Sequence, residues 1–276
     1  MTPSEPGKRV DLYGASYRNF AHDLYAEIRR EAFGEDIGQT SWLTAEEQDL
    51  FISWLGLGKS SRLLDVACGS GKPTLRIAQK TGCHVSGVDI HVDGIASATA
   101  NAREIGYEGR AHFHHANASE RLSFDTASFD AVTCIDAINH LPDRPRVLAD
   151  WHRVLKPGGC LLFTDPIVLT GLITNEEVAI RTSIGHFIFA PHGLDESLLR
   201  QAGFDVERVE DRTPNMASNA AGWHQARASR ESGLRKIEGD DVFLGQQRFL
   251  ETAAKLAGEA RLSRFAILAR KRRKDA

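Results

Sequence analysis

Short apolar runs alternate with longer amphipathic stretches between residues 61 and 165. The apolar runs are typical of buried strands; they are RLLDVA, HVSGVDI, AHFHHA, FDAVTCID and GCLLFTD. The intervening stretches space their apolar residues helically; they are KPTLRIAQKT, GIASATANAREIG and RPRVLADWHRVLKPGG, the last expected to end at Gly158 and Gly159. Strands that alternate with helices of about ten to fifteen residues predict βαβ units and a parallel sheet covered on both faces.

Helical spacing also extends on both sides of this region. It predicts a helix over residues 11–32, a second helix from Thr44 to about Leu55, and helices over 214–262. LDESLLRQAG is expected to add a helix, and FDVERVED and SRFAILAR two further strands. The fold class is therefore α/β: a Rossmann-like, doubly wound, mostly parallel seven-stranded sheet with a helical cap.

The chain divides into seven expected segments. They are a disordered tail (1–10), an N-terminal helical cap (11–58), a ligand-binding core (59–166), a cap insertion (167–190), a continuation of the core (191–213), a second helical cap (214–262), and a last strand with a basic tail (263–276). The cap segments fall before the first strand, after the fifth, and between the last two. Because connections that leave parallel strands emerge at the ligand edge, we expect these segments to enclose a cavity there.

Composition excludes several classes of function. The chain has 276 residues, 42% hydrophobic, with a net charge of −3, which disfavours a nucleic-acid partner. We expect no membrane span and no secretory signal, and so a cytoplasmic protein. A monomer or homodimer is expected. None of the four cysteines forms a CxxC pair, which favours free thiols. His112 and His114 would share a strand face, but no further ligand completes a set, so no metal site is expected.

The small-residue loop in LLDVACGSGKP, residues 63–73, marks the candidate site, because bare backbone N–H groups allow a ligand to approach closely. The GxxxxGK[ST] spacing of a phosphate-binding loop is absent, and Thr74 stands where GxGxxG needs its last glycine. Asp89, 24 positions after Asp65, can accept both hydroxyls of a ribose. The Asp65 carboxylate would repel a pyrophosphate but could order the loop or receive an ammonium group.

These residues resemble the class I S-adenosylmethionine-dependent methyltransferases. DVACGSG fits the first motif of that family, GVDI fits the second, and the stretch from HANASE to LKPGG is similar to its small-molecule branch. The N-terminal region is similar to the sarcosine/dimethylglycine and phosphoethanolamine N-methyltransferase-like proteins. The resemblance implies S-adenosylmethionine as cofactor. It implies cofactor contacts at Asp65, Ala67, Gly69, Gly71, Asp89, Ile90, Asn117, Ala118 and Asp136. Gln39 and Trp42 are added as cofactor contacts because they stand in a loop.

Some of these assignments have structural alternatives. Asp65 could cap the following helix, Asp89 and Asp136 could be turn residues, and Asn117 stands where the family usually has Asp. The Asn117 carbonyl can still accept a hydrogen bond from the adenine amino group.

Acceptor residues are expected at the carboxyl ends of the fourth and fifth strands and in the cap. His140 is the candidate general base, although a helix-capping or solvated histidine is an equal interpretation. Tyr17, Asn139 and His186 are candidate substrate contacts, and Asp165 ends the fifth strand. The expected reaction is methyl transfer to N or O of a small molecule, by in-line displacement in an enclosed site. The alternatives are a non-catalytic S-adenosylmethionine-binding regulator, a methyltransferase of macromolecules, and an NAD-dependent oxidoreductase.

Overall fold

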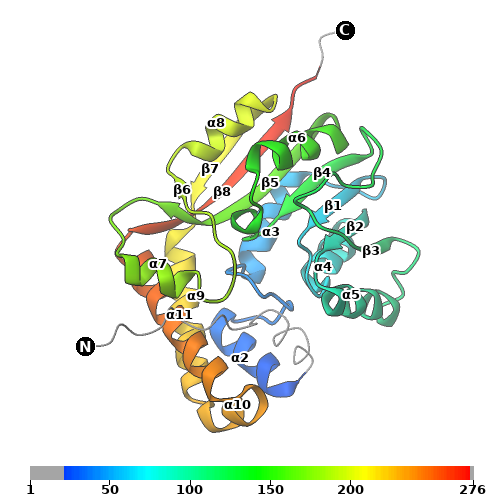
Figure 1. The fold of residues 1–276 in the computed structure, drawn as a ribbon. Coiled ribbons are helices and arrows are strands. Elements are labelled where there is room, and N and C mark those ends of the chain that lie inside the picture. Colours follow the sequence, from blue (N-terminus) through cyan, green and yellow to red (C-terminus); the bar gives the residue numbers. More distant parts are fainter. Residues whose placement is uncertain (1–21, 274–276) are drawn as a thin grey trace.

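The structure is a computed structural model that describes residues 22–273. A mixed eight-stranded sheet forms its centre (Figure 1). The sheet order is β3-β2-β1-β4-β5-β8-β7, and the short β6 pairs with β5 outside this order. Strands β1 to β6 pair with one another in parallel, whereas β8 is antiparallel to both β5 and β7. The strands are β1 (Arg62–Val66), β2 (His84–Asp89), β3 (Ala111–His115), β4 (Phe129–Cys134), β5 (Leu155–Leu169), β6 (Ala190–Pro191), β7 (Phe204–Asp211) and β8 (Leu262–Lys271).

Alternate side chains of the central strands enter two separate cores. Leu64 and Leu161 pack on one face of the sheet, under α6 (Arg144–Val154) and α8 (Leu194–Gln201). Leu63 and Leu162 pack on the other face, which is covered by α3 (Ala45–Leu55), α4 (Lys72–Thr81) and α5 (Val92–Glu104). All four leucines are fully buried. This two-sided burial explains why the strands read as apolar runs, and it confirms the doubly wound, mostly parallel sheet.

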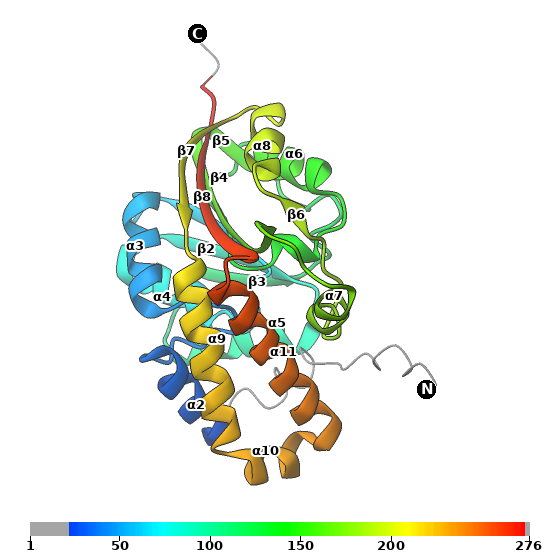
Figure 2. The same cartoon turned by 90° about the vertical axis from the view of Figure 1, so that its left-hand side faces the viewer.

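A group of helices lies beyond one end of the sheet, as Figures 1 and 2 show for α2, α9, α10 and α11. The long α9 and α11 lie side by side, and α2 packs against α9. Trp42, Met216 and Phe249 belong to the apolar cluster that joins these helices to the loop after α2. The helices are α2 (Asp23–Phe33), α7 (Asn175–Arg181), α9 (Thr213–Ala228), α10 (Glu231–Glu238) and α11 (Asp240–Gly258).

Element boundaries differ from the expected ones in two places. Helix α6 ends at Val154, because LKPGG is extended and already belongs to β5. Strand β5 then continues past Asp165 to Leu169, where it pairs with Leu262 of β8.

The predicted helix over residues 11–32 is observed only from Asp23, and its first part lies outside the described residues. The start of α3 is as predicted, since the Thr44 hydroxyl accepts a hydrogen bond from the Glu47 N–H at 3.1 Å.

No helix between residues 22 and 273 is long and apolar enough to cross a membrane.

Candidate active site

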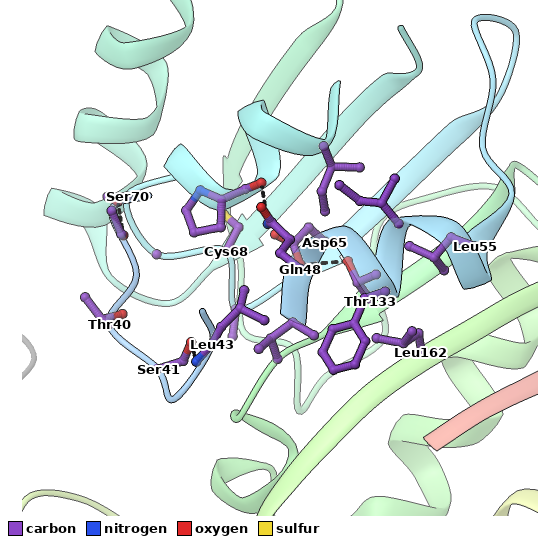
Figure 3. A pocket seen from close by; sticks show the side chains of 18 residues that line it. Thr40, Ser41, Leu43, Gln48, Leu55, Asp65, Cys68, Ser70, Thr133 and Leu162 are labelled. Carbon is purple, nitrogen blue, oxygen red and sulfur yellow. Dashed lines mark hydrogen bonds between the residues drawn. The ribbon is translucent and has the colours of Figure 1, made fainter. Parts of the chain in front are cut away.

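Two cavities lie at the carboxyl ends of β1, β2 and β4. The larger has a volume of about 370 Å³ and the smaller about 60 Å³. Thr40, Ser41, Ala67 and Ile135 line both of them. The two cavities therefore adjoin at the glycine loop, where a single extended ligand can reach from one to the other. Figure 3 shows the smaller one, with Asp65, Cys68 and Thr133 among its lining side chains.

The glycine loop connects β1 to α4 in a conformation that most side chains would not tolerate. Ala67, Gly69 and Gly71 all have positive φ angles, of 59°, 54° and 72°. A Cβ on Gly71 would lie 2.6 Å from the Cβ of Ala98, so this position accepts only glycine. The left-handed backbone turns the loop sharply and leaves its main chain along the cavities, with Ala67 in both linings and Gly69 in the smaller one.

Asp89 ends β2 and lines the larger cavity. Its Oδ2 accepts a hydrogen bond from the Gly69 N–H and its Oδ1 one from the His91 N–H, both at 2.8 Å. The side chain is thereby fixed in place while only 5% of the residue is exposed. A carboxylate oxygen accepts more than one hydrogen bond, so the same two oxygens can also receive a pair of ligand hydroxyls.

The side wall of the larger cavity next to Asp89 includes Ile90, Asn117 and Ala118. Ile90 is 57% exposed, although it is a large apolar residue. The Asn117 carbonyl accepts a hydrogen bond from the Ser119 N–H at 3.0 Å, and its amide donates to Glu120 at 3.1 Å. The wall thus offers an apolar surface beside an oriented amide, which suits a flat aromatic base.

Asp65 reaches the smaller cavity from the end of β1. Its carboxylate accepts a hydrogen bond from the Thr133 hydroxyl at 2.8 Å (Figure 3). It also accepts one from the Thr74 hydroxyl. Burial raises the pKa of Asp65 to about 6, against the lowering effect of these two hydroxyls. Because Thr74 is in the first turn of α4, Asp65 ties that helix to the sheet beneath the glycine loop.

Asp136 follows β4 with a positive φ of 53° and lines the larger cavity. Its carboxylate is already engaged on three sides: by the Arg264 guanidinium at 2.7 Å, the Thr164 hydroxyl at 2.6 Å and the Trp42 N–H at 2.9 Å. Arg264 is fully buried and also pairs with Glu47 at 2.7 Å, and these two carboxylates raise the arginine pKa. Asp136 therefore joins the loop after α2 to β8, and its charge is compensated within the protein.

His140 ends the short 3₁₀ helix η1 (Ile138–His140) and lines the larger cavity. Its Nδ1 lies 2.7 Å from the carbonyl oxygen of His186. Since a carbonyl only accepts, Nδ1 carries the proton and Nε2 is the basic nitrogen. Burial lowers the pKa of His140, and it outweighs the hydrogen bond to the His186 carbonyl, which favours the protonated ring; the ring is therefore neutral at pH 7. This is the state that a general base requires.

The remaining expected residues are placed differently. His186 lines the larger cavity, whereas the side chains of Gln39, Trp42 and Asn139 line neither cavity. Gln39 bonds within its own loop, to Ile37 and Glu35, and the Trp42 ring stacks on Phe249 at 6.5 Å. In this structure both side chains therefore bond or pack within the protein, and their contact with a cofactor stays a prediction.

Asn139 is fully buried, and neither its amide nitrogen nor its amide oxygen has a partner among the described residues. Asp165 is buried in an ion pair with Arg144 at 2.6 Å, away from both cavities. Tyr17 lies outside the described residues.

Several lining residues were not expected from the sequence. Thr40 and Ser41 border both cavities, and Leu141 and Ile184 form part of the apolar wall beside His140. The sequence offered one signal for Thr40 and Ser41, which is their position between Gln39 and Trp42 in a loop that was expected to contact the ligand. Between residues 22 and 273, no three His, Cys, Asp or Glu side chains are grouped so as to hold a metal ion.

Comparisons with known proteins agree with this geometry. A family model described as a methyltransferase domain matches residues 63–159. The 27-O-demethylrifamycin SV methyltransferase of Amycolatopsis mediterranei (strain S699) is 31% identical over 247 residues, which cover 85% of each chain. The chain belongs to the S-adenosylmethionine-dependent methyltransferases. Three other curated relatives are each matched over only 57% of their length.

Solved structures of this methyltransferase fold are also similar. A protein from Galdieria sulphuraria, described as a sarcosine dimethylglycine methyltransferase, has a TM-score of 0.79 at 20% identity, covering 95% of this chain and 98% of its own. Phosphoethanolamine N-methyltransferase 2 of Haemonchus contortus, solved with S-adenosylhomocysteine, has a TM-score of 0.78 at 19% identity, covering 96% and 61%. At these identities the likeness shows the fold.

The cofactor of this methyltransferase is S-adenosylmethionine, and the residues present fit it. The ligand needs an acceptor for two ribose hydroxyls, a surface for adenine, and a path for its amino-acid end along exposed backbone. Asp89, the wall at Ile90, and the Gly69 turn between the two cavities meet these needs.

Proposed function

We propose that this enzyme transfers the methyl group of S-adenosylmethionine to a hydroxyl of a small, mostly apolar molecule, with His140 as the general base. The observation that carries the proposal is the neutral His140 ring in the cavity wall, with its Nδ1 proton held by the His186 carbonyl. An amine acceptor with a free lone pair needs no base, whereas a hydroxyl does. The known relative named for 27-O-demethylrifamycin SV supports an oxygen acceptor of metabolite size.

In this proposal the cofactor lies across both cavities. Asp89 binds the ribose hydroxyls, and Ile90, Asn117 and Ala118 contact the adenine. The amino-acid end lies along Ala67, Gly69 and Gly71, towards Asp65 in the smaller cavity. Asp136 shapes the wall between the cofactor and the acceptor through its bonds to Arg264 and Trp42.

The protein's contribution to the reaction is positioning and proton transfer. S-adenosylmethionine, when bound, supplies a methyl group already activated by its sulfonium. His140 and the apolar residues Leu141 and Ile184 place the acceptor oxygen behind that methyl group and exclude water. His140 Nε2 would accept the hydroxyl proton of the acceptor, while Nδ1 keeps its own proton, donated to the His186 carbonyl. His186, at the same wall, contacts the acceptor beyond its reacting oxygen.

Other features support the setting of this activity. All four cysteines are buried and free, which fits a reducing compartment, and we infer that the enzyme acts in the cytoplasm. The mild net negative charge supports a small-molecule partner in place of a nucleic acid. We propose a monomer or homodimer.

The test is a screen for S-adenosylhomocysteine release with a library of hydroxyl- and amine-bearing metabolites, followed by His140→Gln with the best acceptor. We expect kcat to fall about 10²- to 10⁴-fold, with unchanged affinity for S-adenosylhomocysteine. The wild-type rate should fall only as the pH drops below about 6.5, because protonation of a base whose pKa is lowered removes its activity.

His152→Gln is the matched control. Its pKa is also lowered by burial, and its ring packs on Phe204 at 5.1 Å, away from both cavities. This variant should keep full kcat. An acceptor turned over equally well by His140→Gln and the wild type would contradict the role of His140 and favour an amine.

A further inference from the structure

Arg144 joins three parts of the molecule at a buried point outside both cavities. It begins α6 and is only 4% exposed. Its Nη1 pairs with Asp165 of β5 and with Asp195 of α8, each at 2.6 Å. Its Nη2 donates to the carbonyl oxygen of Ile188 at 3.1 Å. The planar guanidinium fork has donors enough to hold two carboxylates and a carbonyl in one geometry.

Ile188 belongs to the segment 182–189 that forms one wall of the larger cavity. Ile184, Gly185 and His186 of this segment are lining residues. The segment is bonded to η1 at two places: the Ile188 N–H donates to the Asn139 carbonyl at 2.9 Å, and His140 Nδ1 donates to the His186 carbonyl at 2.7 Å. Whatever fixes the backbone of residues 186–188 therefore also fixes the acceptor of the His140 proton.

The ring of His140 is held by the same segment. It packs edge-on against Phe187, with 4.7 Å between ring centroids. Movement of the segment would change both contacts together, and the imidazole would lose the partner that decides which nitrogen carries its proton. Arg144 is well suited to prevent this movement, because its three partners are on β5, α8 and the segment itself.

The ionic surroundings of Arg144 favour a role beyond charge pairing. Two buried carboxylates face one guanidinium, and burial raises the pKa of Asp165 to about 7 in spite of the arginine. Such a buried cluster is a weak source of stability, because the cost of desolvation offsets much of the attraction. Its geometric effect is more specific, since it directs Nη2 at a single backbone carbonyl.

We propose that Arg144 is a positioning residue for His140: it holds the Ile188 carbonyl, and through residues 186–188 it selects the tautomer with the proton on Nδ1 and the basic lone pair on Nε2. The importance of this tautomer for catalysis rests on the proposed function of His140. The structural link does not, and it can be tested without any acceptor.

The experiment compares Arg144→Lys with Arg153→Lys. Lysine keeps a positive charge beside Asp165 and Asp195, but a single ammonium cannot span both carboxylates and the Ile188 carbonyl. Arg153 is the matched control, because it is also in α6, pairs with Asp150 at 2.7 Å, and donates to the carbonyls of Phe124 and Leu122. The readouts are long-range ¹H–¹⁵N spectra of ¹⁵N-histidine-labelled protein, with His140 assigned by its absence in His140→Gln, and hydrogen exchange of the Ile188 N–H.

In Arg144→Lys we expect His140 to change from the Nδ1–H form to a mixture of both tautomers. Exchange of the Ile188 N–H should accelerate about ten- to a hundredfold, as the loss of one charged hydrogen bond predicts. Arg153→Lys should leave both readouts unchanged, and both variants should bind S-adenosylhomocysteine like the wild type. A folded Arg144→Lys protein that keeps the Nδ1–H form and slow exchange would overturn the proposal.

A double variant covers the case in which Arg144→Lys does not fold. Arg144→Met with Asp165→Asn removes one buried negative charge together with the guanidinium. We expect the same mixture of tautomers and the same faster exchange of the Ile188 N–H, and a folded double variant that shows neither would overturn the proposal. Failure of the tautomer prediction leaves the His140→Gln result unaffected, so the two proposals can fail separately.

Discussion

At the residue scale, three buried carboxylates border the cavities and each is held by different partners. Asp89 is fixed by two backbone N–H groups, Asp65 by two threonine hydroxyls, and Asp136 by Arg264. Only Asp136 has a permanent cation beside it. The ionised form of Asp65 is instead disfavoured by burial, which is why its pKa is raised. The ionised Asp65 carboxylate lowers the stability of the fold, but it can pair with a cationic group of a ligand.

Asp65→Asn should make the protein more stable at pH 8. The folded-state pKa of about 6 lies above the ordinary value of 3.8, so the stability linked to the Asp65 proton is fully present below pH 3.8. It is lost as the pH rises through about 6. A shift of about two units corresponds to at most about 3 kcal/mol. Urea unfolding of both proteins at pH 8 and pH 4.5 measures the effect.

The gain from Asp65→Asn should be largest at pH 8 and fall to about a third of that at pH 4.5, where the folded carboxyl is protonated but the unfolded one, with its ordinary pKa of 3.8, is still mostly ionised. The variant should also bind S-adenosylhomocysteine more weakly, because the amide offers no charge to its ammonium group. Lower stability at pH 8 would show that the ionised carboxylate is well compensated in the folded protein.

At the element scale, the loop between α2 and α3 borders both cavities, whereas α3 borders only the smaller one. Thr40 and Ser41 line both of them, and the Trp42 N–H is bonded to Asp136. The Ser70 hydroxyl donates to the Gly38 carbonyl at 3.4 Å, which joins this loop to the glycine loop. A cofactor between the two loops would therefore stabilise the closed arrangement of the first.

S-adenosylhomocysteine should slow chymotrypsin cleavage between Phe33 and Leu43. If cleavage requires opening of a loop that closes over the ligand, a concentration of 100 Kd protects it about a hundredfold. Leu172 is the internal control, because it is 90% exposed in a loop that borders neither cavity. Mass spectrometry of the fragments measures both sites in one reaction. Equal cleavage in both states at the first site would mean that the loop does not close over the cofactor.

The elements that sequence predicted well are those whose residues are buried on both sides. RLLDVA and GCLLFTD read as strands because Leu63, Leu64, Leu161 and Leu162 all enter a core. LKPGG was placed in a helix because its two glycines resemble a helix end, and only pairing with β4 shows that it is strand.

Within the site, local motifs placed Asp65, Gly69 and Asp89 at the cavities. The partners of Asp136 could not be predicted, because Arg264 is 128 positions away and no local pattern links the two. The side chains of Gln39 and Trp42 line neither cavity, which could not be predicted because a loop sequence does not reveal which way its side chains face.

At the scale of the whole molecule, the larger cavity is lined by the glycine-loop edge of the sheet together with segments that precede β1 and follow β5. Residues 22–58 contribute Thr40 and Ser41, residues 59–166 contribute the glycine loop, Asp89 and His140, and residues 182–189 contribute His186. These parts are far apart in the sequence, and a bound cofactor would contact at least two of them. Binding should therefore raise the melting temperature of the whole unit.

The most direct test of this account is calorimetric titration of S-adenosylhomocysteine into the wild type, Asp89→Ala and Asp93→Ala. Asp93 is an exposed carboxylate four positions away, in the first turn of α5, and it borders neither cavity. We predict micromolar-scale binding by the wild type and by Asp93→Ala. Asp89→Ala should bind about 10- to 100-fold more weakly, because the ribose hydroxyls lose a charged acceptor. Equal affinity in all three proteins, or no binding by the wild type, would contradict it.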